Sequence, residues 1–320
     1  MPKRGYAWWY LDALSDDGGH GLTIIAFIGT VFSPWYALAR HAQGGTGGDP
    51  ENHCCLNVVL YGTPSRWAMT DRRRHALRRD ATTLTIGPSS LHWDGEWLTV
   101  TIREVTAPIP SRLAGTVRLR PNALTPRRFV LDSHGRHEWQ PIAPRSRVEV
   151  ALDSPALRWR GAAYFDTNAG AAPLEQDFRE WDWCRAMLPD ATAILYNAER
   201  RDGSRISLAL RATDDGGVAD FASSNASPGA APKPLMPWSM RWRRGPLSQQ
   251  ARCAVSMIFA ASRRRRRRQP CSARLGWSDA VVLPRERRRA YFLPSRMLSP
   301  LSAARSIDPK MIITGFRVIN

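Results

Sequence analysis

The stretch Tyr164-Phe165-Asp166-Thr167-Asn168 has the alternating pattern of a β-strand. Alternate side chains of a strand point to the same side of a sheet, so Tyr164, Asp166 and Asn168 are expected to share one face. Elsewhere helical periodicity is scarce, and short β-branched and aromatic runs recur between Gly, Asp and Pro turns. The pattern predicts an all-β fold with a polar and aromatic face on this strand.

A second stretch, His137-Glu138-Trp139, repeats the alternation upstream and would put His137 and Trp139 on one face of another strand. Two such strands turned inward would bring a carboxyl, a phenol, an imidazole and an indole into one cavity. Burial among aromatic rings disfavours the charged form of a carboxyl group, so Asp166 would keep its proton longer. The rings could face a developing cation. This set of groups suits acid chemistry on an apolar substrate.

Further strands are expected at fairly regular spacing along the chain. The turn at residues 15–19 should join the first two, and the later ones follow between turn signals. The expected strands are residues 5–14, 22–32, 57–61, 82–86, 98–102, 115–119, 129–131, 147–152, 193–198 and 205–211. Trp181-Asp182-Trp183 echoes the aromatic start of the chain, which indicates a second, similar β-unit.

Charge is distributed unevenly over the 320 residues, a length that suits one large or two ordinary domains. Residues 1–240 hold 27 basic and 25 acidic side chains, whereas residues 241–320 hold 19 and 3. The body is therefore nearly neutral, which argues against a nucleic-acid partner although the total is +18. The six arginines at 263–268 repel one another and predict a poorly ordered basic tail.

The five cysteines lack the spacing of a disulfide framework or a zinc site, since two are adjacent and no Cys-x-x-Cys occurs. Free thiols in a reducing compartment are expected. The start of the chain lacks the apolar core of a signal peptide, and the longest apolar run, residues 22–32, is too short to span a bilayer. We therefore expect a cytoplasmic protein that rests on a membrane surface.

Several ordered motifs between residues 5 and 210 resemble the carotenoid 1,2-hydratases, also called hydroxyneurosporene synthases. The motifs are Gly5-Tyr6-Ala7-Trp8-Trp9-Tyr10, Ser15-Asp16-Asp17-Gly18, Val31-Phe32-Ser33-Pro34, Asn52-His53-Cys54, Arg66-Trp67-Ala68-Met69-Thr70, Leu91-His92-Trp93-Asp94-Gly95 and Trp139-Gln140-Pro141-Ile142-Ala143-Pro144.

The resemblance implies two lipocalin-like β-barrels that hold a long polyene. Residues 5–175 would form the first barrel, with the active site, and residues 176–240 would begin an incomplete second barrel. Residues 241–320 would be the atypical, Arg-rich segment. The implied reaction adds water to the terminal C=C of acyclic carotenoids such as neurosporene and lycopene, without a redox cofactor or a metal. The implied location is the cytoplasmic side of the inner, photosynthetic membrane.

The family's His-x-Trp and Tyr-x-Asp motifs fall on His137, Trp139, Tyr164 and Asp166. We expect Asp166 to donate the proton, Trp139 and Tyr164 to line the cavity and face the cation, and His137 to orient the water or to accept its proton.

The sequence departs from the family after Asn168, where an aromatic residue and two carboxylates give way to Ala169-Gly170-Ala171-Ala172. The family's C-terminal strands are also not recognisable in residues 241–320, and a reading-frame shift would produce such an Arg-rich segment. These departures leave an alternative open, in which the protein is a non-catalytic lipocalin-like carrier of a carotenoid or another lipid.

Overall fold

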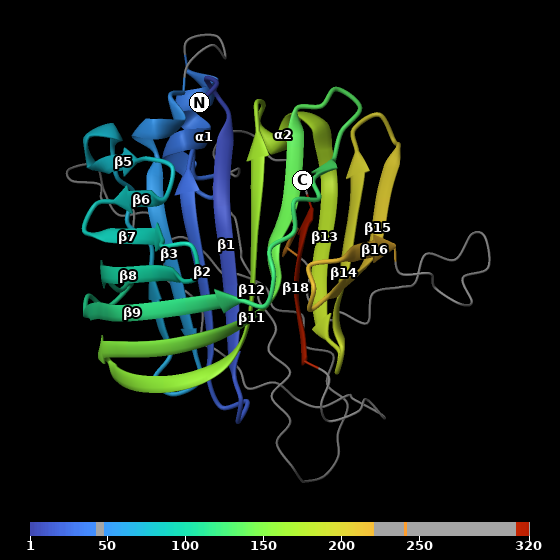
Figure 1. The fold of residues 1–320 in the computed structure, drawn as a ribbon. Coiled ribbons are helices and arrows are strands. Elements are labelled where there is room, and N and C mark those ends of the chain that lie inside the picture. The colour runs from blue at the N-terminus through green and yellow to red at the C-terminus, as the bar shows by residue number, and fades with distance from the viewer. Residues whose placement is uncertain (43–47, 221–239, 242–311, 320) are drawn as a thin grey trace, which may run out of the picture.

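Strands dominate the described part of the chain and form two sheets (Figure 1). The computed structural model describes residues 1–42, 48–220, 240–241 and 312–319. The predicted all-β fold is confirmed. The arginines at 263–268, and most of the segment 241–320 that was expected to be poorly ordered, lie outside the described residues.

The first sheet has twelve strands, and every pairing in it is antiparallel. Its order is β4-β3-β2-β1-β12-β11-β9-β8-β7-β6-β5, with β10 paired to β11. The strands are β1 Tyr6–Ser15, β2 Gly21–Ile28, β3 Cys54–Tyr61, β4 Arg66–Ala68, β5 Leu77–Arg79, β6 Thr83–Ile86, β7 Ser89–Trp93, β8 Leu98–Val105, β9 Arg112–Pro121, β10 Phe129–Val130, β11 His137–Ser154 and β12 Ala156–Gly170.

This sheet curls around an apolar core of its own. Figure 1 shows β5 to β9 running across β1 to β3. Buried aliphatic side chains from nearly all of its strands fill the interior, among them Leu11, Val58, Val117 and Phe165. The strand expected over residues 22–32 ends at Ile28, because the chain then turns into a short helix.

The second sheet has six strands among the described residues, in the order β16-β15-β14-β13-β18-β17. They are β13 Phe178–Met187, β14 Ala191–Arg200, β15 Arg205–Thr213, β16 Val218–Asp220, β17 Met240–Arg241 and β18 Ile312–Ile319. Strand β18 belongs to the segment 241–320, and it pairs with β13 along Glu180 to Met187. The most C-terminal described residues therefore complete a sheet that begins near residue 178.

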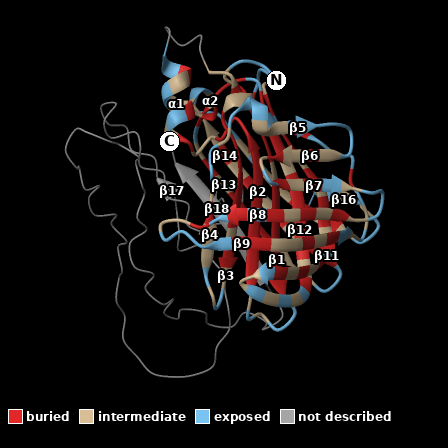
Figure 2. Ribbon diagram, turned by 90° about the vertical axis from the view of Figure 1, so that its left-hand side faces the viewer, coloured by how far each residue is buried: buried red, intermediate tan, exposed pale blue. Residues whose placement is uncertain are grey.

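A second core lies between the two sheets. It combines aromatic side chains of β1, β11 and β12, such as Trp8 and Tyr164, with Trp181, Trp183 and Tyr196 of β13 and β14. Figure 2 shows that burial is concentrated along the middle of these strands, whereas the connecting loops are exposed. Strands β1 and β12 therefore contribute side chains to both cores, one on each face.

Two short helices, α1 (Pro34–His41) and α2 (Leu174–Asp177), lie at the same end of the molecule (Figures 1 and 2). An ion pair of 2.6 Å between Arg40 and Glu175 joins them. Ser33 caps α1 by accepting a hydrogen bond from the Tyr36 amide. The Tyr36 hydroxyl in turn donates to the carbonyl of Gly5, just before β1, at 2.5 Å.

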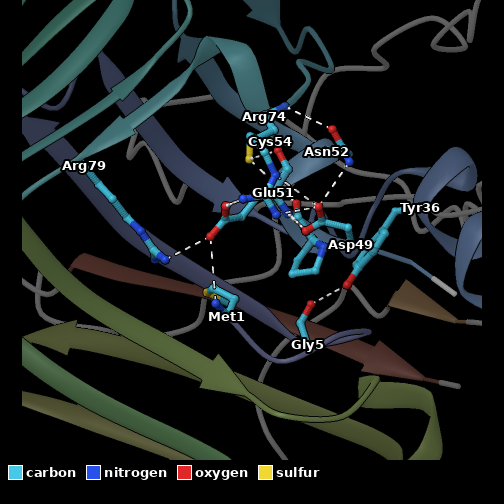
Figure 3. A network of polar contacts seen from close by, with 10 residues as sticks. Met1, Gly5, Tyr36, Asp49, Glu51, Asn52, Cys54, Arg74 and Arg79 are labelled. Carbon is cyan, nitrogen blue, oxygen red and sulfur yellow. Dashed lines mark hydrogen bonds and ion pairs between the residues drawn. The ribbon is translucent and has the colours of Figure 1, made fainter. Parts of the chain in front are cut away.

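A polar network beside α1 also holds the start of β1 (Figure 3). Glu51 accepts ion pairs from Arg74 at 2.6 Å, from Arg79 at 3.0 Å and from the amino group of Met1 at 3.8 Å. Asp49 pairs with the same Arg74 at 2.6 Å. The network thus joins the amino end of the chain to Arg79 of β5 through Glu51.

We predict that Gly161→Ala destabilises the fold strongly, because a Cβ there would lie 2.0 Å from the backbone oxygen of Leu14. Overpacking of this kind costs about 1–3 kcal/mol. Ala162→Ser on the next, half-buried position is the control and should shift the free energy of unfolding by less than about 0.5 kcal/mol. Denaturant unfolding of both variants measures the difference, and equal midpoints would contradict the close contact between β1 and β12.

Candidate active site between the two sheets

Strand β12 divides its side chains between the two cores. Ala163 and Phe165 belong to the core of the curled sheet, whereas Tyr164 belongs to the core between the sheets. Asp166 and Asn168 follow Tyr164 at the same spacing of two and are also buried. The expected shared face of these three residues therefore exists, and it is the face that the second sheet covers.

The carboxyl group of Asp166 is at the centre of this face and is 3% exposed. Its Oδ2 accepts a hydrogen bond from the indole Nε1 of Trp139 at 2.9 Å and another from the Tyr164 hydroxyl at 2.8 Å. Its Oδ1 is buried and has no hydrogen-bond partner among the described residues. One oxygen is thus held by two donors, whereas the other accepts no hydrogen bond from the described residues.

Burial raises the pKa of Asp166 from 3.8 to about 7. The hydrogen bonds from Trp139 and Tyr164 oppose this effect because they favour the carboxylate, and the neighbouring charge of Asp12 reinforces it. The group therefore exists largely as a carboxylic acid up to neutral pH.

Aromatic rings surround the acid on both sides. The Trp139 ring lies 5.2 Å from that of Phe129 and 5.0 Å from that of Tyr196, measured between centroids. The Tyr164 ring lies 5.1 Å from Trp183. Because Trp183 and Tyr196 come from β13 and β14, the second sheet supplies half of the enclosure.

His137 belongs to a separate hydrogen-bonded group. Its Nε2 is 2.6 Å from Asp177 Oδ2, and its Nδ1 is 2.9 Å from the Tyr6 hydroxyl. Burial lowers the pKa of His137, although Asp177 opposes this, so the ring is neutral near pH 7. An ionised carboxylate only accepts, so we assign the ring proton to Nε2 and the Tyr6 hydroxyl as donor to Nδ1.

The structure therefore brings together three of the four predicted site residues. His137 pairs in register with Gly170, four residues beyond Asp166, and four residues of strand span about 13 Å. The expectation that the imidazole shares one cavity wall with the acid needs correction. The alternating pattern gave the correct face for His137 but not its position along the strand.

A buried ion pair was missed by sequence reasoning. Asp12 on β1 and Arg185 on β13 are each 1% exposed and pair across the two sheets. The guanidinium carbon lies 5.4 Å from the centre of the Tyr164 ring. A signal was available, because Asp12 continues the alternating face of Tyr10, and Arg185 continues that of Trp183.

The other features that the sequence analysis raised lie away from this site. Cys54, Cys55 and Cys184 are free thiols. No group of three or more metal-ligating side chains occurs among the described residues.

A cleft of about 250 Å³ over β8 and β9 is lined by Thr101, Arg112 and other residues, none of which belongs to the site. In the part of the chain that the structure describes, no helix has the length and apolar character needed to cross a membrane.

Comparison with known families decides the family of the chain. The sequence model described as Carotenoid hydratase CrtC matches residues 24–265. The chain belongs to the CrtC carotenoid hydratase family. The match continues past residue 210, where the recognisable motifs end, and includes the beginning of the Arg-rich segment. Residues 241–265 of that segment are therefore part of the sequence that matches the CrtC family.

Curated relatives in the CrtC family are closely similar over much of the chain. The acyclic carotenoid 1,2-hydratase of Thiocapsa roseopersicina is 56% identical over 218 residues, which cover 68% of this chain and 53% of that protein. The enzyme of that name from Rubrivivax gelatinosus is 52% identical over 250 residues, covering 77% and 59%. The one from Cereibacter sphaeroides is 43% identical over 230 residues, covering 67% and 80%. The chain thus spans between one half and three fifths of the first two relatives.

Solved structures are similar only distantly. A putative AttH from Nitrosomonas europaea is 16% identical with a TM-score of 0.43, covering 68% of each chain. Kievitone hydratase from Nectria haematococca is 9% identical with a TM-score of 0.44, covering 68% of this chain and 65% of the other.

We predict that Asp166→Asn stabilises the protein above neutral pH. Because the folded pKa is raised from 3.8 to about 7, the wild type loses stability as pH rises through this window. The variant has no such loss and should be more stable at pH 8 by on the order of 2 kcal/mol. Its advantage should shrink as pH falls towards 4.

Thermal unfolding from pH 4 to pH 9 measures this effect. Asp16→Asn is the control, because Asp16 is exposed and its hydrogen bond to Arg147 lowers its pKa. The control should therefore gain nothing at pH 8. A wild type and an Asp166→Asn variant with parallel pH profiles would show that the carboxyl group is ionised without cost.

Proposed function

We propose that the chain is a hydratase that adds water to the terminal C=C of acyclic carotenoids such as neurosporene and lycopene. Two lines of support meet in this proposal. The family relatives carry the name acyclic carotenoid 1,2-hydratase. The carrying observation is the buried carboxyl group of Asp166, with two donors on one oxygen and none on the other.

The chemistry requires an acid of this kind. An isolated alkene is a weak base, so its hydration begins with proton transfer from a well-placed acid. Asp166 gives its proton to the less substituted carbon, and the positive charge develops on the tertiary carbon. The Trp139 and Tyr164 hydrogen bonds then stabilise the carboxylate that remains.

The aromatic rings around Asp166 support the next event, in which the tertiary cation is stabilised until water attacks it. The faces of Trp139, Tyr164 and Trp183 carry negative charge density that attracts a cation. Such a contact contributes about 1–2 kcal/mol in a site from which water is excluded. A tertiary cation that forms between these rings lasts long enough for one water molecule to attack it.

His137 has a more distant role than the sequence suggested. Both of its ring nitrogens are engaged, by Asp177 and by Tyr6. We assign it the positioning of the Tyr6 hydroxyl at the α2 end of the inter-sheet core, beyond the reach of the Asp166 carboxyl group.

A membrane surface is the proposed source of the substrate, since an acyclic carotenoid dissolves in lipid and not in water. Two large apolar side chains of α1, Trp35 and Leu38, are 52% and 60% exposed. Apolar groups on a surface helix are suited to the boundary between headgroups and acyl chains. The proposed location is peripheral to the cytoplasmic face of the inner, photosynthetic membrane.

The decisive assay incubates the protein with lycopene under anaerobic conditions and measures a product heavier by one water. We expect the wild type to form this product and Asp166→Asn to lose at least a hundredfold in rate, because general-acid catalysis contributes about 10²–10⁴. Asp182→Asn is a matched control. Burial raises the pKa of Asp182 to about 7 as well, but this residue lies between Trp181 and Trp183 on β13, so its side chain points away from the core between the sheets.

Equal loss in both variants would reject Asp166 as the specific acid. A wild type that binds lycopene and returns it unchanged would favour the non-catalytic carrier over the hydratase. Because Asn is close in size to Asp, retained carotenoid binding by the Asp166→Asn variant separates loss of chemistry from loss of the site.

The pH dependence of hydration offers an independent test. The pKa of Asp166 is raised to about 7, so the fraction that carries the reacting proton falls above this pH. We expect kcat/KM to be level below pH 6 and to fall tenfold per pH unit above pH 8, whereas carotenoid binding stays constant. A rate that is level from pH 6 to pH 9 would mean that another group donates the proton.

A further inference from the structure

The attacking water must lose a proton after it adds to the cation. The assignment of Asp166 as the proton donor does not identify the group that accepts this second proton. His137 lies four residues along the strand from the position of Asp166, and both of its nitrogens are engaged. A second buried carboxyl group lies much nearer. Asp12 of β1 projects from the same face as Asp166 into the core between the sheets.

The register of β1 and β12 sets the spacing of the two carboxyl groups. Tyr10 pairs directly with Asp166, and Asp12 pairs with Tyr164. Asp12 and Asp166 are therefore diagonal neighbours on two adjacent strands, with their Cα atoms about 7–8 Å apart. Carboxyl groups that act as an acid and base pair with a water molecule between them are separated by a similar distance, about 6.5–9.5 Å.

The surroundings of Asp12 differ from those of Asp166, because Asp12 has a cationic partner. Arg185 Nε donates to both of its oxygens, at 2.9 and 3.2 Å, and Nη2 donates to Oδ1. The Tyr10 hydroxyl donates to Oδ2 at 3.1 Å. A guanidinium group that binds a carboxylate with two nitrogens forms strong, charge-assisted hydrogen bonds. Two carboxyl groups whose environments differ in this way are suited to be an acid and a base.

We propose that Asp12 is the catalytic base of the hydration, and that Arg185 holds it ionised and correctly positioned. This assignment rests on the proposed hydratase function. Asp166 transfers its proton to the CH carbon of the terminal alkene. The water oxygen bonds to the tertiary cation, and its surplus proton goes to a carboxylate oxygen of Asp12. The cycle closes when that proton returns to Asp166, so that one water is added and no proton is gained or lost.

Arg185 offers a further group to the water. Its Nη1 is buried and has no hydrogen-bond partner among the described residues. An unpaired buried donor costs free energy unless a ligand or a water satisfies it. Asp166 Oδ1 is another buried atom of the site without a hydrogen-bond partner among the described residues. In the proposed mechanism the water or the product hydroxyl accepts a hydrogen bond from Nη1, next to the carboxylate that takes its proton.

Hydrogen exchange separates the acid from the base. In D₂O a deuterated Asp166 transfers deuterium to the alkene, and return of the cation to the alkene leaves deuterium at the CH carbon. This exchange needs no water attack and no Asp12. Lycopene recovered from the reaction is analysed by mass spectrometry for deuterium, and the product is analysed for added water.

The main variant is the double substitution Asp12→Asn with Arg185→Gln, which removes both charges and leaves no unpaired arginine in the core. We expect hydration to fall at least a hundredfold and deuterium exchange to persist. The double variant should bind carotenoid like the wild type. Asp166→Asn should lose both hydration and exchange. Hydration by the double variant at the wild-type rate would overturn the proposal, as would loss of exchange together with hydration in a folded double variant.

If the Asp12–Arg185 pair only joins the two sheets, a different result is expected. The charge-exchanged variant, Asp12→Arg with Arg185→Asp, keeps an ion pair but moves the carboxylate to β13. This charge-exchanged variant therefore still tests the proposal if the neutral double variant does not fold. We expect it to keep exchange and lose hydration, whereas retained hydration would show that the pair is structural.

His137→Gln completes the series. If it loses hydration and keeps exchange while the Asp12 variants hydrate normally, the base is His137, and the assignment to Asp12 is rejected. A wild type that shows neither hydration nor exchange would reject the hydratase function itself, which is a different outcome from failure of Asp12 alone.

Discussion

The enclosure of the Asp166 carboxyl group between two sheets is the constraint on which the proposed chemistry depends. A carboxylate in an apolar core is costly, so the group retains its proton to higher pH. The curled first sheet alone would not produce this effect, because Asp166 lies on the face that points away from its own core. Trp183 and Tyr196 of the second sheet make that face an interior. The acid therefore belongs to the pair of sheets and not to either one.

The same core holds a second carboxyl group with different hydrogen-bond partners. Asp166 receives two neutral donors on one oxygen, whereas Asp12 receives a guanidinium group and a phenol. Neutral donors only partly offset burial, but an adjacent cation offsets it well. The Asp12 charge in turn raises the pKa of Asp166. The Arg185 charge lowers the same pKa, so the main contribution of the ion pair is to join the sheets and to supply a carboxylate beside the acid.

How far the sequence predicts this arrangement depends on the range of each interaction. The spacing of two along β12 assigned Tyr164 and Asp166 to one face, and Trp139 to a neighbouring strand, because this periodicity is local. It did not give the register of β11 against β12, which contains irregularities between Gln140 and Ser146. The position of His137 along the strand therefore did not follow from the pattern. Arg185 and Tyr196 were missed because packing between sheets joins residues far apart in the chain. The alternating pattern places Arg185 on the face of Trp183, but it does not identify the partner on the other sheet.

The alanines that follow Asn168 can also be assigned to faces only with the structure at hand. Ala169 is exposed and continues the face of Phe165, so it does not point towards Asp166. The missing aromatic residue of the family pattern would therefore not form a wall of the inter-sheet site. Gly170 is different, because a Cβ there would lie 2.3 Å from the Tyr6 ring and 2.7 Å from His137 Nδ1. The residue that the hydrogen-bonded group of His137 requires is thus present, and the missing aromatic residue falls on the other side of the strand.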